Sequence, residues 1–337
     1  MPWLMFALSA TVIVLAGTKL SQYGDDIAEH TGLGRLWIGV VLLSAATSIP
    51  EIFTAVSAVM IDAPNIAVGD LLGAGLTNMF TLGLIDLVYR QKRVWRQAAL
   101  EQALVASLAM TLTGLAGLLI VLRTSMALWA VSVGTMLIAL AFVLGMRVVF
   151  RQEDMRRRER EREKVVEAEE VRRMLPTGAH ALRRAAVGFA LASLAILLAA
   201  PFLAESAKEI AETTGISATF IGTSLVAITT ALPELVTSLA AVRLGAFDLA
   251  VGNLYGSNAF NMAVLFVADA AYRKGPLLNA VDQSHAVTAW ISILLMNVGL
   301  MGIIYRAEKR FLLIEPDSLL IIAGYGLAIW VLFRLAG

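Results

Sequence analysis

Long runs of apolar residues, separated by short polar stretches, recur along the whole chain. A helix of about 20 apolar residues crosses the hydrocarbon core of a bilayer, so each run predicts a membrane-spanning helix. A membrane β-barrel would show short segments of alternating polarity instead. The predicted fold is an all-α membrane protein with ten transmembrane helices at about 3–20, 36–61, 64–89, 98–121, 126–149, 184–204, 216–242, 246–271, 286–305 and 317–335.

Composition narrows the class of protein. Of the 337 residues, 58% are hydrophobic and only 16% are charged, with a mean hydropathy of +0.77, whereas soluble domains carry about 25% charged residues. The chain has no cysteine, and its three histidines, His30, His180 and His285, are far apart. We therefore expect no thiolate, zinc or haem site and no cofactor. The net charge of +1 gives no support to nucleic-acid binding.

The basic residues near the span ends predict an orientation. Lys and Arg collect at 90–96, 151–183 and 306–310, which fall on one side when ten spans alternate. We assign that side to the cytoplasm, so both termini lie outside a prokaryotic-type cell membrane. Arg273 and Lys274 depart from this pattern. Acid–base pairs at helical spacing predict that 151–183 is a solvated helical linker.

The chain also repeats itself. With a shift of 183 residues, TSIPEIFT at 47–54 aligns with TALPELVT at 230–237, and AVGDLLG at 67–73 aligns with AVGNLYG at 250–256. The shared Pro, Glu, Gly and Thr do not follow from hydrophobicity alone. We infer two five-helix repeats, at 1–150 and 184–337. Because five is odd, the second repeat is inverted, and inverted repeats place a transport site near the membrane midplane.

Glu51 and Glu234 occupy matched positions in the middle of two spans. A carboxylate at the bilayer centre costs roughly 2.5–3.5 kcal/mol, so it requires compensation. Spans 36–61, 64–89 and 216–242 contain no interior Lys or Arg that could provide it. Two interpretations stay open: a neutral, protonated Glu held by hydrogen bonds, or a carboxylate whose missing counter-charge is the transported cation.

Oxygen atoms accompany both glutamates. Pro50 and Pro233 lack the N–H that would bond a carbonyl four residues earlier, which frees backbone oxygens in both spans. Thr47, Ser48 and Thr230 add hydroxyls, unless these bond back to their own helix. The next spans add Asp70, Asn78, Asn253, Ser257, Asn258 and Asn261. Such an all-oxygen set suits a hard cation such as Ca²⁺ and argues against zinc or copper.

These motifs resemble a known family. TSIPE with GAGLTN, and TALPE with YGSNAFN, are similar to the α-repeats of sodium/calcium exchangers, within the cation/Ca²⁺ exchanger superfamily. The resemblance implies a Ca²⁺ bridged by Glu51 and Glu234, and a unit of spans one and six that slides past the rest. It implies further oxygens from Thr47, Thr230, Ser257, Asn78 and Asn261, with backbone oxygens near Ser44 and Ala227 completing flanking Na⁺ sites. Ser48 and Asp70 complete our set of candidate ligands.

Four positions depart from the family pattern. Ala74 and Gly75 stand where a serine and an asparagine are usual, Ala231 replaces another serine, and Asp70 replaces an asparagine. Two hydroxyls are lost and one carboxylate is gained. We therefore expect a weakened Na⁺ site near Ala74, and a proton becomes a second candidate for the driving ion.

We expect a secondary active antiporter, not an enzyme, that exchanges Ca²⁺ for Na⁺ by alternating access. Two nearby carboxylates repel each other by several kcal/mol, at about 4 Å and an effective dielectric near 20, and cations relieve this repulsion. The expected partners are the transported cations and the lipid bilayer, and the expected assembly is a monomer. The alternatives are a Ca²⁺/H⁺ antiporter, a cation channel lined by the same glutamates, and a non-transporting relative.

Overall fold

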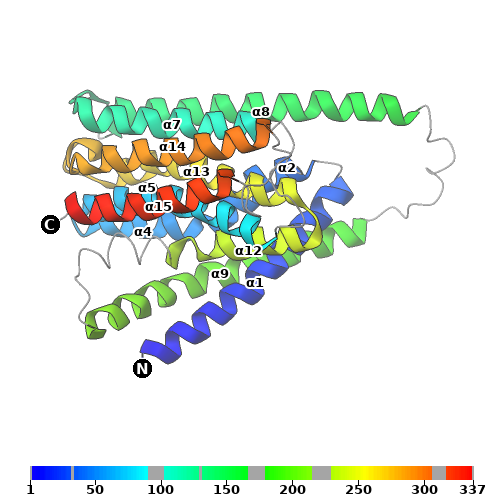
Figure 1. The fold of residues 1–337 in the computed structure, drawn as a ribbon, viewed down its shortest axis with the longest axis horizontal. Helices are drawn as coiled ribbons and strands as arrows, with labels where there is room; N and C mark the ends of the chain where they lie inside the picture. Colours follow the sequence, from blue (N-terminus) through cyan, green and yellow to red (C-terminus); the bar gives the residue numbers. More distant parts are fainter. Residues whose placement is uncertain are drawn as a thin grey trace.

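The computed structural model describes residues 2–31, 34–89, 102–128, 131–165, 179–214, 229–305 and 316–335. These residues are nearly all helical, and the strands among them, β1 (Ala127–Leu128) and β2 (Val131–Ser132), pair antiparallel. The longer helices form one bundle (Figure 1): α1 (Pro2–Thr31), α4 (Ile49–Met60), α5 (Pro64–Val88), α7 (Gln102–Leu122), α8 (Val133–Val165), α9 (Ala179–Thr214), α12 (Leu232–Leu244), α13 (Phe247–Ala271), α14 (Ser284–Tyr305) and α15 (Pro316–Leu335). The short helices are α2 (Arg35–Trp37), η1 (Ile38–Leu43), α3 (Ser44–Thr47) and η4 (Leu277–Asn279).

Seven of the described helices are long and apolar enough to cross a membrane, and an eighth span results if the bent pair Arg35–Thr47 and Ile49–Met60 is counted as one. The seven are α1, α5, α7, α8, α9, α14 and α15. Helix α12 has only 13 residues, and 216–228, the first part of the same predicted span, lie outside the described residues. Helix α13 is continuous, but buried polar side chains interrupt its apolar sequence. Ten spans therefore stay a prediction.

Three helices extend well beyond the predicted spans. Helix α1 continues past residue 20 to Thr31, α9 continues past residue 204 to Thr214, and α8 continues past residue 149 to Val165. These extensions are polar, so a hydropathy pattern does not reveal them. The extension of α8 projects beyond the ends of the other helices (Figure 1), and it forms the helical beginning of the linker.

The bundle has apolar side chains outside and many polar side chains inside. Leu15, Leu198 and Phe333 are exposed, whereas Glu51 and Asn253 are buried. Lipid is the medium that tolerates such an outer surface. Helices α5 and α13 are buried along most of their length and contact each other, whereas α1 and α9 pack mainly on one another at one side of the bundle (Figure 1). This is the arrangement of a membrane protein.

The duplication is visible in the element bounds. Helices α4, α5 and α8 begin at Ile49, Pro64 and Val133, and α12, α13 and α15 begin 183 residues later, at Leu232, Phe247 and Pro316. Helices α5 and α13 are both 25 residues long. The two halves therefore use the same order of breaks and helices.

The second span is broken at Ser48, as Pro50 predicts. Ser48 leaves the helical conformation, with φ −87° and ψ 5°, and the two segments meet at 41°. Before the break, Ile38–Leu43 forms a π-helix that the sequence did not predict. Its backbone lies against α13, because a Cβ on Gly39 would stand 2.6 Å from the carbonyl oxygen of Leu249. The broken helix is thus held closely against the other half of the protein.

Two buried carboxylates fasten the halves to each other at the ends of α5 and α13. Asp269 Oδ2 accepts from the Ser132 N–H and the Thr135 hydroxyl, both at 2.6 Å, just before and within the first turn of α8. Asp86, at the matched position, accepts from the Ser318 hydroxyl at 2.7 Å in α15. Ser318 is the counterpart of Thr135. Each half therefore anchors the last helix of the other half.

Candidate cation site

Glu51 and Glu234 each lie in the first turn of the helix that follows a break. Both are fully buried. Pro50 and Pro233 stand at the helix start, where the missing N–H is not needed. The unpaired N–H groups of a first turn and the helix dipole both favour a negative charge there. The local sequence thus positions one carboxylate at the positive end of a helix in each half.

Most oxygens of this carboxylate pair have no hydrogen-bond partner in the described part of the chain. Glu234 Oε1 accepts from the hydroxyls of Ser48, at 3.3 Å, and Ser257, at 3.4 Å. Glu234 Oε2 and both oxygens of Glu51 are buried without such a partner. The two carboxylates also repel one another. Since buried unpaired charge is costly, the arrangement favours occupation by a cation.

Two threonines connect the halves beside the glutamates. Thr230 Oγ1 donates to Asp70 Oδ1 at 3.0 Å. Thr47 Oγ1 lies 3.3 Å from Asn253 Oδ1 and 3.1 Å from the carbonyl oxygen of Leu43, so its one proton has an alternative within its own helix. The structure therefore brings Thr47, Thr230 and Asp70 to the interface between the halves.

Asparagines of α5 and α13 form hydrogen bonds between the two halves. Asn78 Nδ2 donates to Asn258 Oδ1 at 2.9 Å, and Asn258 Nδ2 donates to the Gly75 carbonyl at 3.4 Å. Within the described ranges, Asn78 Oδ1 and both polar atoms of Asn261 are buried and unpartnered. The amide oxygens of Asn78 and Asn261 are thus available to a cation.

Of the backbone oxygens predicted near Ser44 and Ala227, the structure describes those at Ser44. Ser44 is buried, its hydroxyl donates to the Val40 carbonyl, and its own carbonyl accepts from the Ser48 N–H at 2.9 Å. A carbonyl has a second lone pair, which is what Ser44 could offer to an ion. Ala227 lies outside the described residues. Asn253 and Asn258 belong to the wider set of polar residues that the sequence predicts in these spans, and the shift of 183 residues pairs Asn253 with Asp70.

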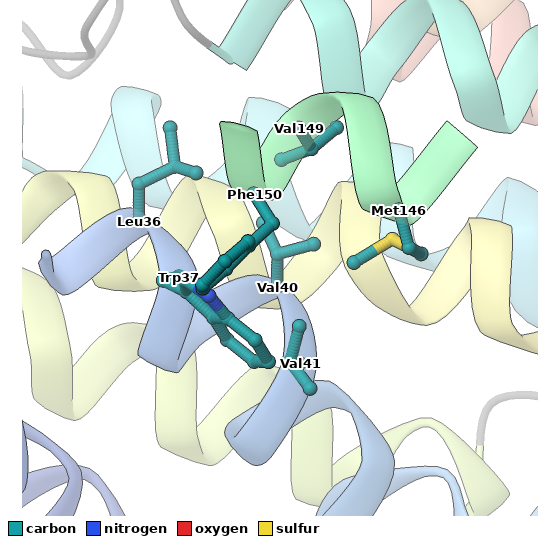
Figure 2. Close-up of a pocket in the computed structure, with 7 residues that line it drawn as sticks. All are labelled: Leu36, Trp37, Val40, Val41, Met146, Val149 and Phe150. Carbon is teal, nitrogen blue, oxygen red and sulfur yellow. The ribbon is translucent and has the colours of Figure 1, made fainter. Parts of the chain in front are cut away.

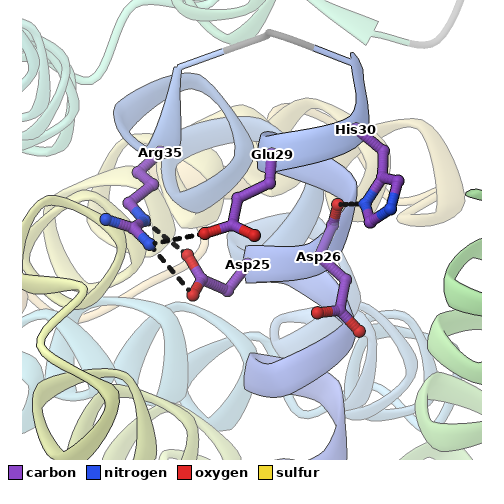
Figure 3. A network of polar contacts seen from close by, with 5 residues as sticks. All are labelled: Asp25, Asp26, Glu29, His30 and Arg35. Atoms are coloured by element: carbon purple, nitrogen blue, oxygen red, sulfur yellow. Dashed lines mark hydrogen bonds and ion pairs between the residues drawn. The ribbon is translucent and has the colours of Figure 1, made fainter. Parts of the chain in front are cut away.

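The described cations are not paired with the site carboxylates. The Nη2 of Arg35 contacts Asp25 Oδ2 at 3.1 Å and Glu29 Oε1 at 3.2 Å, so its charge is balanced at the end of α1 (Figure 3). No salt bridge among the described residues involves Glu51, Glu234 or Asp70. A glutamate neutralised by a buried Lys or Arg therefore finds no support in this part of the chain.

An apolar pocket lies apart from the carboxylates, between the α2–η1 segment and α8. Figure 2 shows the side chains that line it, which are Leu36, Trp37, Val40, Val41, Met146, Val149 and Phe150. The rings of Trp37 and Phe150 meet edge to face at 5.8 Å. None of these side chains carries an oxygen ligand, so this pocket is not a cation site.

The acidic residues alone do not form a metal centre. In the ranges that the structure describes, no three His, Asp or Glu side chains stand close enough together to hold a metal ion. A cation between Glu51 and Glu234 would therefore depend on the hydroxyl, amide and carbonyl oxygens around them.

Solved structures of a known transporter share the fold. The sodium-calcium exchanger NCX_Mj, in crystals soaked with Na⁺ and zero Ca²⁺, superposes with a TM-score of 0.69 and 20% identity over 98% of this chain and 99% of that chain. A structure from crystals soaked with Na⁺ and Sr²⁺ gives a TM-score of 0.69 and 20% identity over 98% and 97% of the two chains. At this level of identity the likeness establishes the fold.

Two curated proteins match in sequence. Inner membrane protein YrbG of Escherichia coli is 27% identical over 299 residues, which is 85% of this chain and 87% of that protein. An uncharacterized membrane protein of Methanocaldococcus jannaschii is 32% identical over 83 residues, which is 22% of this chain and 28% of that protein. The second match thus spans little more than a quarter of the archaeal protein.

The family match is broader. The sodium/calcium exchanger protein family matches residues 1–150 and 184–334, which lie on either side of the charged linker. Each region contains one of the two buried glutamates, Glu51 in the first and Glu234 in the second. The chain therefore belongs to the sodium/calcium exchanger family, and it is a membrane transporter rather than an enzyme.

Proposed function

We propose that this protein exchanges Ca²⁺ for Na⁺ across the membrane by alternating access at a site built on Glu51 and Glu234. The observation that carries the proposal is that both carboxylates are fully buried, and that three of their four oxygens lack a partner among the described residues. Ca²⁺ takes six to eight oxygen ligands. The further oxygens would come from Thr47, Ser48, Thr230, Ser257, Asn78, Asn261 and the carbonyls near Ser44 and Ala227.

Charge balance explains why such a site exchanges ions. One Ca²⁺ or two Na⁺ neutralise the same two carboxylates, so the ions compete for one place. Repulsion between the carboxylates disfavours an empty site, and a neutralised site passes more easily through the apolar interior. This favours exchange over leak. Support also comes from NCX_Mj, which is a sodium-calcium exchanger studied in crystals soaked with Na⁺, Ca²⁺ or Sr²⁺.

The proposal includes an architecture of ten transmembrane helices in two inverted repeats, 1–150 and 184–337, with 151–183 in the cytoplasm and both termini outside. Contacts between loops support this assignment of loops to the two sides of the membrane. Asp62 pairs with Lys274 at 2.6 Å, and Asn65 accepts from the Asp282 N–H at 2.7 Å, which brings two outer loops together. At the opposite end, Gln102 donates to the Asp248 carbonyl at 2.8 Å.

The same loop contact explains why Lys274 departs from the charge pattern. The Asp62 carboxylate, which is hydrogen-bonded to Lys274, raises the pKa of this lysine. Its positive charge is thus balanced by a residue of the loop it touches. A basic residue that is paired in this way is compatible with the outer side.

The decisive experiment is transport by purified protein in liposomes. Glu51→Gln and Glu234→Gln should each reduce ⁴⁵Ca²⁺ uptake driven by a Na⁺ gradient by roughly 100-fold or more, because each removes a charge that the ion needs. Glu209→Gln, at an exposed position of α9, should transport at the wild-type rate. Wild-type uptake by both site variants would refute the proposal. If a pH gradient drives Ca²⁺ flux in the absence of Na⁺, the driving ion is the proton rather than Na⁺.

A further inference from the structure

An ion pair joins the C-terminal end of α1 to the start of the broken second span. Arg35 Nε donates to Asp25 Oδ1 at 2.5 Å, and Arg35 Nη2 donates to Asp25 Oδ2 at 3.1 Å. The same Nη2 lies 3.2 Å from Glu29 Oε1. Asp25 and Glu29 are four residues apart on α1, so one helix face presents both carboxylates to the guanidinium (Figure 3).

The contact between Arg35 and Asp25 has the geometry of an effective ion pair. Most exposed ion pairs contribute little to stability, whereas a two-fold contact between a guanidinium and a carboxylate fixes both groups. The side chain of Asp25 is 16% exposed, against 62% for Glu29. Water therefore screens the contact with Asp25 less, and we expect most of the stabilisation to come from it.

The ion pair connects parts of the bundle that pack differently. Helix α1 packs mainly on α9, and also on α12. Arg35 begins α2, which continues through η1 and α3 to the break before Glu51. Where α1 meets η1, a Cβ on Gly24 would lie 3.6 Å from Ile38 Cγ2. A small, apolar contact of this kind tolerates a shift of one helix along the other, whereas an ion pair holds one position.

The sequence of the second half contains no matching pair of charges. The shift of 183 residues matches Asp25 with Lys208 and Arg35 with Ala218, and an alanine carries no charge. The proposed function requires two end states, which inverted repeats can reach by movement of one part of the bundle against the other. A contact that one half makes and the other cannot make gives these two states different free energies.

We propose that Asp25 and Arg35 form a latch that holds α1 against α2 and favours the described conformation over the other end state of the transport cycle. This inference rests on the proposed alternating access. The latch does not contact the transported cation. Breaking it removes stabilisation from one state only, so the populations shift toward the other state by the free energy that the ion pair contributes.

The test is the distance between α1 and α14 in the purified full-length protein, measured by double electron–electron resonance in liposomes. The chain has no cysteine, so Leu15→Cys on α1 and Met301→Cys on α14, both at exposed positions, can carry the spin labels. With the latch intact, the population whose distance agrees with the structure should be the larger one. Arg35→Gln and, independently, Asp25→Asn should shift the ratio of the two populations by roughly two- to fivefold toward the other one.

Two further variants separate the latch from a general loss of packing. The exchange Asp25→Arg with Arg35→Asp restores opposite charges and should return the ratio toward that of the wild type. Lys274→Gln removes the ion pair with Asp62 at 2.6 Å, which does not involve α1, and should leave the ratio unchanged. Thermal unfolding checks that each variant is folded. Unchanged populations in both single variants, an equal shift in Lys274→Gln, or no return after the charge exchange would each overturn the latch.

Transport separates this inference from the proposed function. Loss of Na⁺-driven ⁴⁵Ca²⁺ uptake in Glu51→Gln and Glu234→Gln, together with unchanged populations in Arg35→Gln, refutes only the latch. Wild-type uptake by both glutamate variants refutes the proposed cation exchange, and with it the role of the latch in transport.

Discussion

At the scale of single residues, the two glutamates differ in the hydroxyls that reach them. Ser257 donates to Glu234 Oε1 at 3.4 Å. The residue matched to Ser257 is Ala74, which is buried and has no hydroxyl. Both oxygens of Glu51 lack a partner among the described residues. The missing hydroxyl is therefore a direct reason for the less complete surroundings of Glu51.

Ala74→Ser should restore this hydroxyl. A hydrogen bond or ligand contact of this kind contributes about 0.5–1.5 kcal/mol, so we expect the apparent Na⁺ affinity of transport to rise by roughly two- to tenfold. The Na⁺ dependence of ⁴⁵Ca²⁺ flux in liposomes measures this change. Ala328→Ser, at a buried position of α15 away from the site, should leave the Na⁺ dependence unchanged. Equal Na⁺ dependence of Ala74→Ser and wild type would contradict the assignment.

Residue types could be predicted from the sequence better than residue pairs. Glu51, Glu234 and Asp70 stand out because acidic residues are rare within apolar spans. The contact of Ser48 with Glu234 joins residues that are 186 positions apart, and periodicity contains no information on such a pairing. The same holds for Asn78 and Asn258. The repeat predicted which positions are equivalent, but packing between the halves decides which of them touch.

At the scale of elements, the broken second span depends on close contact with α13. A Cβ on Gly39 would stand 2.6 Å from the Leu249 carbonyl oxygen, and a Cβ on Gly256 would stand 2.7 Å from the Val40 carbonyl oxygen. These neighbours are backbone atoms, which cannot turn aside as a flexible side chain can. The π-helix at Ile38–Leu43 lies within this contact. It therefore depends on packing between the two halves, which the local sequence does not reveal. Pro50, in contrast, made the break at Ser48 predictable.

Gly39→Ala should destabilise the protein by about 1–3 kcal/mol, the usual range for overpacking. Gly326→Ala in α15 is the matched control, because no atom lies within 4 Å of its added Cβ, and alanine is the better helix former by about 1 kcal/mol. Thermal unfolding in detergent should thus show a lower Tm for the first variant and an equal or higher Tm for the second. Equal Tm values for Gly39→Ala and the wild type would show that the backbones of η1 and α13 can move apart without loss of stability.

At the scale of the whole molecule, the helices of the bundle differ in what they pack against. Asp86 and Asp269 tie α5 and α13 to the last helices of the opposite halves. Helices α1 and α9 instead pack mainly on each other, although α1 also packs on α12. These are the helices of spans one and six, the pair that the family resemblance suggests as the sliding unit. A helix pair that packs mainly on itself, beside the helices that carry the polar side chains, is compatible with alternating access.

The proposed orientation can be tested directly because the natural chain has no cysteine. Met126, which is 71% exposed, follows α7 at the end assigned to the outside, and Met155, which is 59% exposed, lies on the extension of α8. Met126→Cys should react with a membrane-impermeant maleimide in intact cells, whereas Met155→Cys should react only after permeabilisation, because the basic extension stays in the cytoplasm. The two positions flank the membrane-spanning part of one helix, so labelling in the reverse order would invert the whole molecule, and labelling of both in intact cells would show that α8 does not cross the membrane.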